Sequence, residues 1–356
     1  MNNGNVVARF EQAFAEYVGA RYAIALCNGT ATLHTALEAL WTPGQVAVPP
    51  LTMSATTIAV LHAKGTPHFV DIDPDTWLMA GIPLDVSASI GVSLYGLHWN
   101  GTWLDPRDGG RMDGRAIIDD AAQTLAPFAY PDGSSYPDFK SYSFQASKIL
   151  ALGEGGMLVT NDEDLARRAR EFSSLGYRMD PDQPRIDPSV LKHPTYERHH
   201  SLGWNYRMSD LVAEWGVWHM AGVDDRGDDI ETPDTLRLNR IMCATRYADA
   251  IDGCLWITPQ HVPEGWVHDY WCYAVALESA ELWEPFTEAV VRHGGEMPYG
   301  AWRLTYQEPA FRHLAEDGCC PVAEDLQPRI VQFQTNKVES AKVNADAVAK
   351  AIQDIG

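Results

Sequence analysis

Ser141-Tyr-Ser-Phe-Gln-Ala-Ser-Lys148 joins a run of β-favouring residues to a lysine placed just past its carboxyl end. Open α/β sheets bind their ligands at that edge. The turn Gly153-Glu-Gly-Gly156 follows, and the segment is otherwise nearly free of charge. A lysine is normally a solvated surface charge, but a desolvated lysine loses its proton more easily and can attack an aldehyde to form an imine. Lys148 is therefore a candidate reactive amine.

The sequence around this segment alternates helical patterns with short apolar runs. Helical periodicity is expected at residues 6–18, 31–40 and 55–63, and β-like runs at 22–26, 46–48, 68–72, 89–95, 116–119, 141–144 and 156–160. Continuously apolar strands between helices are typical of a mainly parallel sheet covered on both faces. The predicted fold class is α/β, with this sheet in a large domain.

The second half of the chain predicts a smaller α+β domain. A helix over 162–175 with Asp162 as its N-cap, a long loop over 178–199 and a helix over 209–220 lead to a domain change between residues 224 and 237. Beyond it we expect a strand at 271–277 and helices at 283–293 and 338–355. The predicted domains are residues 1–228 and 229–356.

Composition excludes several classes of protein. The 356 residues, 46% of them hydrophobic, suffice for a large core, and a net charge of -21 argues against a nucleic-acid partner. No stretch approaches the length of a membrane span, and the N-terminus lacks a signal core, so the prediction is a cytoplasmic protein without a membrane partner. The six cysteines lack metal-ligand spacing and are interpreted as free thiols, so no metal site is expected.

Two further segments carry candidate chemistry. Residues 117–123 read Ile-Ile-Asp-Asp-Ala-Ala-Gln, an apolar strand ending in two carboxylates, which alone could be a helix N-cap. Residues 28–32 read Asn-Gly-Thr-Ala-Thr, a strand-turn-helix junction whose first N–H groups could hold a phosphate without any lysine. As an isolated motif this junction is about as consistent with an ordinary capped turn.

Together these segments resemble the DegT/StrS-type sugar aminotransferases, a branch of the fold-type-I pyridoxal-phosphate (PLP) enzymes. The similarity also covers Val48-Pro-Pro-Leu-Thr52, Phe69-Val-Asp-Ile-Asp73 and Gly203-Trp-Asn-Tyr-Arg-Met-Ser209, and it runs from about Gly4 to the C-terminus. It implies a PLP-dependent enzyme that moves an amino group from an amino acid, expected to be L-glutamate, to a keto-sugar, a nucleotide-linked keto-sugar or a keto-cyclitol.

The resemblance also implies a role for each matched residue. Lys148 would be the Schiff-base lysine and proton shuttle, and Asp120 would pair with the pyridine nitrogen of the cofactor. Gln123 would lie near its 3-hydroxyl. Its phosphate would be bound by residues from two segments: Gly29, Thr30 and Ser143. Asn205 would reach that phosphate from a neighbouring subunit, so a homodimer with a shared active site is expected.

Several positions depart from the family pattern. Met53 stands where an aromatic ring usually stacks on the cofactor, and it can still cover a ring through its polarisable sulfur. The segment 75–115 is shorter than usual, Ser93 stands where a histidine is common, the N-terminus begins late, and the 178–200 loop is rich in His and Pro. These departures concern the substrate pocket more than the cofactor site.

Other candidates are weaker. Four histidines are interpreted as structural or surface residues, with only the third of them singled out for mutation: His98, His199, His200 and His268. The 12 tryptophans are interpreted as core and interface anchors. Arg207 and Arg303 are candidate contacts for a nucleotide-linked acceptor.

Two alternatives to amino transfer remain open at this point. One is a PLP lyase or dehydratase, although sugar dehydratases of this fold typically carry histidine at the position of Lys148. The other is a non-catalytic partner protein that keeps the PLP fold, against which the intact Lys148, Asp120 and Gln123 weigh.

Overall fold

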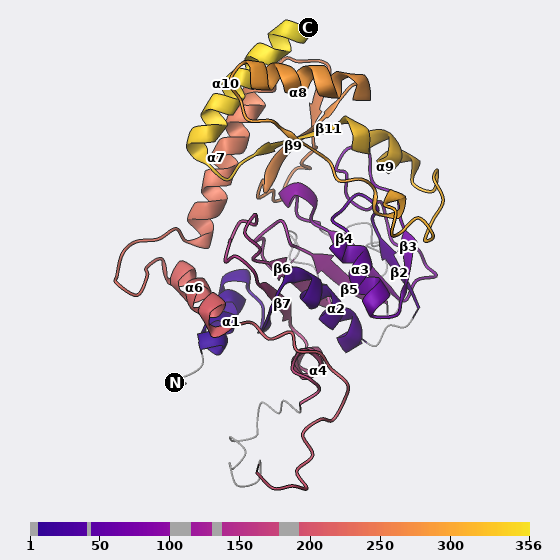
Figure 1. The fold of residues 1–356 in the computed structure, drawn as a ribbon, viewed down its shortest axis with the longest axis vertical. Helices are drawn as coiled ribbons and strands as arrows, with labels where there is room; N and C mark the ends of the chain where they lie inside the picture. The colour runs from indigo at the N-terminus through magenta and orange to yellow at the C-terminus, as the bar shows by residue number, and fades with distance from the viewer. Residues whose placement is uncertain (1–5, 41–43, 100–114, 130–136, 178–191) are drawn as a thin grey trace.

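The computed structural model describes residues 6–40, 44–99, 115–129, 137–177 and 192–356. Its larger sheet has seven strands in the order β1-β7-β6-β5-β4-β2-β3 (Figure 1). Their bounds are Tyr22–Leu26 (β1), Gln45–Val48 (β2), Thr66–Phe69 (β3), Ala88–Val92 (β4), Ala116–Asp120 (β5), Phe139–Ser143 (β6) and Gly156–Thr160 (β7). Only β7 runs antiparallel to its neighbours β1 and β6, so the predicted mainly parallel sheet is confirmed.

Helices cover both faces of this sheet. The bounds are Val6–Val18 (α1), Gly29–Leu40 (α2), Ala55–His62 (α3), Glu163–Ser173 (α4) and Asp210–Ala221 (α6). Side chains alternate along each strand, and in β1 Ile24 and Leu26 pack with α2 whereas Ala23 and Ala25 pack with α1. The larger sheet is therefore buried on both sides, and its apolar strands follow from that burial.

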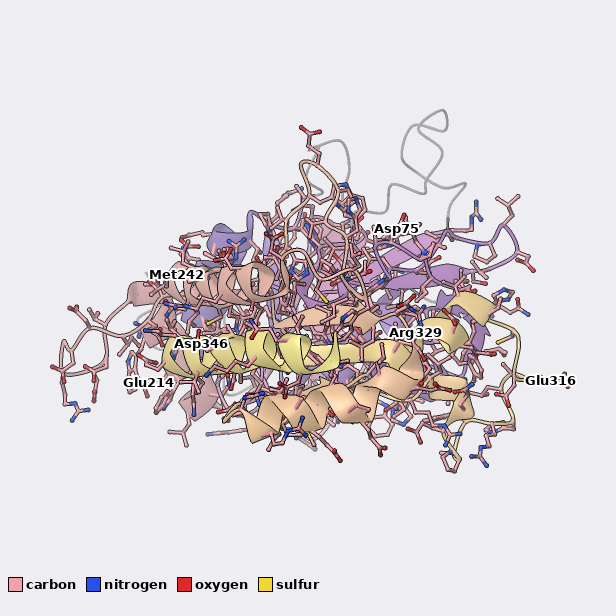
Figure 2. The ribbon with its side chains drawn as sticks, turned by 90° about the horizontal axis from the view of Figure 1, so that it is seen from above. Asp75, Glu214, Met242, Glu316, Arg329 and Asp346 are labelled. Atoms are coloured by element: carbon pink, nitrogen blue, oxygen red, sulfur yellow. The ribbon has the colours of Figure 1, made fainter. Side chains whose placement is uncertain are left out.

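A second sheet of four strands, β10-β11-β9-β8, forms the rest of the molecule. The strands are Ile257–Pro259 (β8), Cys272–Leu277 (β9), Tyr299–Gly300 (β10) and Ile330–Gln334 (β11), and the helices are Pro233–Ile251 (α7), Trp283–Arg292 (α8), Pro321–Leu326 (α9) and Val338–Ile355 (α10). Seen from above in Figure 2, α10, which carries Asp346, lies beside α7, which carries Met242. The predicted division at residue 228 falls between α6 and α7 and stays a prediction.

The structure corrects some predicted elements. The predicted strand 68–72 is shifted to β3, the strand 141–144 is shifted to β6, and the run 89–95 divides into β4 and a 3-10 turn at Leu94–Gly96. Within that turn Tyr95 has a φ of 59°, which a strand does not allow. Helix α7 was not predicted. The Asp162 N-cap is confirmed, because its carboxylate accepts the N–H of Leu165.

Within the described ranges, each helix is too short or too polar to span a membrane.

Candidate active site

A cavity of about 450 Å³ lies at the carboxyl ends of β4, β5 and β6 and the start of α2. It brings together seven of the eight residues predicted for the site. Its lining is Asn28, Gly29, Thr30, Leu33, Thr52, Met53, Ala55, Val92, Asp120, Ala122, Gln123, Ser143, Gln145, Ser147, Lys148, Glu154, Trp271 and Trp302. The eighth, Asn205, lies outside this lining on an exposed segment bridged to Ser174.

Lys148 sits in the loop that joins β6 to β7. Main-chain hydrogen bonds close this loop, including those from Ala146 N–H to the Gly153 carbonyl and from Leu152 N–H to the Phe144 carbonyl. The Lys148 amine lies 5.0 Å from the centroid of the Trp271 ring. Burial lowers the pKa of Lys148, and the nearby Arg240 cation adds to this, while Asp120 opposes it. The site therefore makes the Lys148 amine easier to deprotonate than an exposed lysine, and the neutral form is the nucleophilic one.

Asp120 is the last residue of β5 and is buried. Its carboxylate accepts the hydroxyl hydrogen of Thr56 at 2.8 Å and the N–H of Ala122 at 3.2 Å. Burial raises the pKa of Asp120, so a cation placed against it inside the cavity would be stabilised and would in turn hold the carboxylate ionised. This is the environment that a protonated ring nitrogen requires.

Gln123 is held in one orientation by the main chain. Its side-chain carbonyl accepts the N–H of Tyr95, the residue with the positive φ. Because the oxygen is engaged, the amide NH₂ is the end of the side chain left to donate to a group in the cavity. The turn at Leu94–Gly96 therefore determines that Gln123 offers a hydrogen-bond donor, rather than an acceptor, to the cavity.

The first turn of α2 forms an anion cradle. The Asn28 side chain accepts the N–H of Ala31 at 2.8 Å, and the amides of Gly29 and Thr30 precede it at the helix start, where N–H groups have no partner in the helix. A Cβ on Gly29 would lie 2.9 Å from the Cβ of Ser143, so glycine lets the Ser143 hydroxyl approach the same point. These donors suit a phosphate without needing a lysine.

Two tryptophans from the smaller sheet region complete the wall. Trp271 and Trp302 lie 5.9 Å apart between ring centroids, and both line the cavity. Trp271 also packs against the apolar core, as predicted for the tryptophans. Neither carries a motif signal, because only tertiary packing brings them to Lys148. Met53 lines the cavity as well, half-exposed, with its sulfur accepting the N–H of Ala55 at 3.3 Å.

The remaining candidates lie elsewhere. His98 is buried beside the Asp119–Lys140 ion pair, and His268 bonds Gln260 and stacks on Tyr270, which confirms a structural role for both. The three other predicted side chains on the 199–207 segment are exposed: His199, His200 and Arg207. Arg303 lines a separate cavity of about 400 Å³ that shares Thr52, Met53 and Trp302 with the site. The described residues contain no cluster of three groups suited to a metal ion.

The model of the DegT/DnrJ/EryC1/StrS aminotransferase family matches residues 1–353. The chain belongs to this family. A relative in curated collections is GDP-perosamine synthase of Caulobacter vibrioides, 35% identical over 232 residues that cover 62% of this chain and 58% of that protein. The chain thus spans less than two thirds of that relative's length.

Two other similarities extend over more of the family fold. The UDP-N-acetyl-3-dehydro-alpha-D-glucosamine 3-aminotransferase of Acidithiobacillus ferrooxidans is 29% identical over 344 residues, 93% of this chain and 83% of that protein. NtdA from Bacillus subtilis, solved with its bound cofactor PMP, has a TM-score of 0.80 at 20% identity and covers 99% of this chain and 78% of its own. At that identity the second similarity supports the fold alone.

Proposed function

We propose that this protein is a pyridoxal 5'-phosphate-dependent aminotransferase that moves an amino group from an amino acid to a keto-sugar or keto-cyclitol. The observation that carries the proposal is that Lys148 and Asp120 line one cavity together with the anion cradle built by the start of α2 and Ser143. Membership of an aminotransferase family supports the same reaction.

The residues fit this cofactor one by one. Gly29, Thr30 and Ser143 would hold its phosphate, Asp120 would face its ring nitrogen, and Gln123 would donate to its 3-hydroxyl. When bound, the cofactor supplies an aldehyde carbon and an electron-withdrawing ring. Lys148 would bind that carbon and, once released by the amino donor, would carry a proton between the substrate carbon and the cofactor.

The substrate class follows from the relatives and from the cavities. The names of the two curated relatives refer to sugars, and one of them to a nucleotide-linked 3-keto sugar. The 400 Å³ cavity beside Met53 and Trp302, with Arg303 on its wall, offers space next to the cofactor cavity for such an acceptor. We propose L-glutamate as the amino donor.

We also propose a homodimer in which Asn205 contacts the phosphate of the neighbouring subunit. Large apolar side chains near Asn205 are exposed: Leu202 at 95%, Trp204 at 56%, Leu211 at 76% and Trp215 at 56%. Exposed apolar patches of this kind mark contact surfaces. Sedimentation should show a dimer, and a monomeric, fully active Asn205→Ala variant would contradict the shared site. A cytoplasmic location stays a prediction.

The central experiment replaces the reactive amine. Lys148→Ala should bind the cofactor weakly through the phosphate donors but lose the absorbance of a lysine-bound cofactor and all amino transfer. Lys342→Ala, which removes an exposed lysine from α10, is the matched control and should behave as wild type. Normal turnover by Lys148→Ala would refute the assignment.

The absorbance spectrum of the cofactor distinguishes amino transfer from the two alternatives, a lyase or dehydratase and a non-catalytic protein. Adding L-glutamate to the loaded protein should convert the cofactor to its amine form, which then accumulates until a keto acceptor is supplied. A lyase need not accumulate that form. A protein that stays colourless after the cofactor is supplied would favour the non-catalytic alternative.

A further inference from the structure

Asp269, between β8 and β9, is a fully buried residue that does not line the cofactor cavity but holds a segment that does. One oxygen of its carboxylate accepts the hydroxyl hydrogen of Thr124 and, at 2.8 Å, the N–H of Leu125. Arg237 of α7 donates to the other oxygen at 2.8 Å and supplies the counter-charge. The two residues that the carboxylate holds directly follow Gln123 in the chain.

The main chain of Asp269 holds the turn that orients Gln123. Its N–H donates to the Gly96 carbonyl at 2.8 Å, and Gly96 ends the turn in which the Tyr95 N–H binds the Gln123 side-chain carbonyl. A Cβ on Gly96 would lie 2.7 Å from the Tyr270 nitrogen, so only a glycine lets the two segments approach this closely. Asp269 is thus bonded both to the segment that carries Gln123 and to the turn that fixes the direction of its amide.

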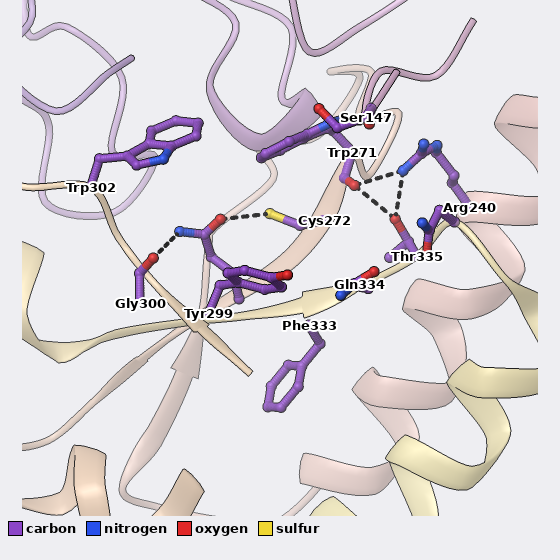
Figure 3. Close-up of a pocket in the computed structure, with 12 residues that line it drawn as sticks. Ser147, Arg240, Trp271, Cys272, Tyr299, Gly300, Trp302, Phe333, Gln334 and Thr335 are labelled. Atoms are coloured by element: carbon purple, nitrogen blue, oxygen red, sulfur yellow. Dashed lines mark hydrogen bonds between the residues drawn. The ribbon is translucent and has the colours of Figure 1, made fainter. Parts of the chain in front are cut away.

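The segment that carries Asp269 is itself anchored. Two residues further on, the Trp271 carbonyl accepts hydrogen bonds from the Arg240 guanidinium at 2.7 Å and from the Thr335 hydroxyl at 2.9 Å (Figure 3). These contacts fix the end of the segment independently of Gln123. Asp269 is therefore a fixed point against which the position of Gln123 is set.

We propose that Asp269 is a positioning residue for Gln123, which keeps the Gln123 amide directed into the cavity to donate to the 3-oxygen of the bound cofactor. The inference rests on the proposed cofactor-dependent function. A hydrogen bond donated to that oxygen favours its ionised form, so it lowers the pH at which the lysine-bound chromophore loses its proton. Loss of Asp269 should therefore raise this transition pH, although its side chain does not touch the cofactor.

The test is a pH titration of the absorbance of the holoenzyme. Gln123→Leu removes the donor and should raise the transition pH by about one pH unit, the worth of one hydrogen bond. Asp269→Asn should raise it by about half a pH unit, because a misplaced amide keeps part of the contact. A direct charge effect would have the opposite sign, since removing a carboxylate lowers the proton affinity of nearby groups. The sign of the change therefore separates positioning from electrostatics.

Further variants test the same contact without changing the charge. Thr124→Val removes the hydroxyl that donates to Asp269 and should also raise the transition pH, whereas Thr124→Ser keeps the hydroxyl and should match the wild type. In a Gln123→Leu background, Asp269→Asn should add nothing, because the group through which it acts is gone. Glu11→Gln is the matched control. Glu11 likewise accepts a main-chain N–H and pairs with Arg170 at 2.8 Å, so its loss should lower stability without moving the transition pH.

The outcomes separate this inference from the function on which it rests. An unchanged transition pH in both Asp269→Asn and Thr124→Val, or in Gln123→Leu, would overturn the positioning role while cofactor binding stands. An Asp269→Asn effect that persists in full in the Gln123→Leu background would overturn it as well. Thr124→Val decides the matter if Asp269→Asn does not fold. A wild-type protein that forms no lysine-bound chromophore would overturn the proposed function and this inference together.

Discussion

Two lysine–aspartate pairs involve neighbouring carboxylates at the carboxyl end of β5, and they lie in different surroundings: Asp119 with Lys140 of β6, and Asp120 with Lys148 of the β6–β7 loop. Asp119 and Lys140 are fully buried, with the Lys140 amine 3.1 Å from the carboxylate. Ser93 donates to the same carboxylate at 2.9 Å, and Lys140 also donates to the Pro127 carbonyl at 2.7 Å. Burial would raise the pKa of Asp119, but Lys140 and His98 outweigh it and hold that pKa low.

Asp120 and Lys148 instead face the open cavity. Neighbouring residues of a strand point to opposite faces, so the two carboxylates enter different surroundings although they are adjacent in sequence. Among the residues that the structure describes, Asp120 accepts hydrogen bonds from Thr56 and Ala122 and forms no ion pair. The Lys148 amine lies over the Trp271 ring. We call Asp119 and Lys140 the closed pair, because protein groups satisfy both charges. We call Asp120 and Lys148 the open pair, because both line a cavity where a ligand could contact them.

The largest expected effect that separates the pairs is on turnover. Asp120→Asn removes the anion that would hold a ring nitrogen protonated, so kcat should fall by about 10²- to 10⁴-fold. The free energy of unfolding should change less than for the buried Asp119–Lys140 pair, because among the described residues Asp120 forms no ion pair and acts on Lys148 only at longer range. Steady-state kinetics and chemical denaturation measure the two quantities, and unchanged kcat would remove the distinction between the pairs.

The closed pair should control stability instead. Lys140→Met leaves the buried Asp119 charge without its main partner, and the free energy of unfolding should fall by about 3–5 kcal/mol. The double variant Lys140→Met/Asp119→Leu removes both charges and should recover most of that loss. If urea denaturation showed the single and double variants to be equally unstable, the pair would not act as a unit.

The open pair should make the stability of the cofactor-free protein depend on pH. Burial depresses the pKa of Lys148, so the folded state is penalised wherever the amine is protonated, and the penalty disappears as pH rises toward the ordinary lysine pKa of about 10.4. Lys148→Met should therefore stabilise the protein most at pH 6 and progressively less toward pH 10. Lys342→Met, at an exposed site, should show no such trend in thermal melts. A gain that grows with pH would contradict the depressed pKa.

The smallest effect concerns the cavity wall. Met53→Phe restores an aromatic ring where the family usually has one, and ring stacking should slow cofactor release by about two- to tenfold. Met53→Leu, similar in size and without a ring, serves as the control. Dialysis followed by absorbance measures retention, and faster release from the phenylalanine variant would indicate that position 53 does not cover the cofactor.

The site residues that could be predicted from the sequence are those that lie shortly after the end of a predicted strand. Asp120 ends β5, and Gln123 and Lys148 follow within three and five residues of a strand end, so local pattern and family motifs placed them in one cavity. The direction of β7 was not evident, since a fully buried strand reads the same whether it is parallel or antiparallel. Helix α7 was missed because its apolar residues form no clear stripe.

The residues that were missed come from distant parts of the chain. Trp271, Trp302 and Arg240 lie between 92 and 154 positions after Lys148, and no local spacing relates them to it. Arg240 looks like an ordinary surface cation on a polar helix until α7 packs against the Lys148 loop. Tertiary packing, rather than periodicity, creates this side of the site.

Because β7 runs antiparallel beside β6, the loop that carries Lys148 begins and ends on two strands that are hydrogen-bonded to each other. The Lys148 side chain can rotate about its four-carbon stem, while main-chain hydrogen bonds within the loop, including the one from its own N–H to the Gln145 carbonyl, hold its Cα. If Lys148 binds and releases the cofactor as proposed, its amine would therefore keep the same position from one catalytic cycle to the next.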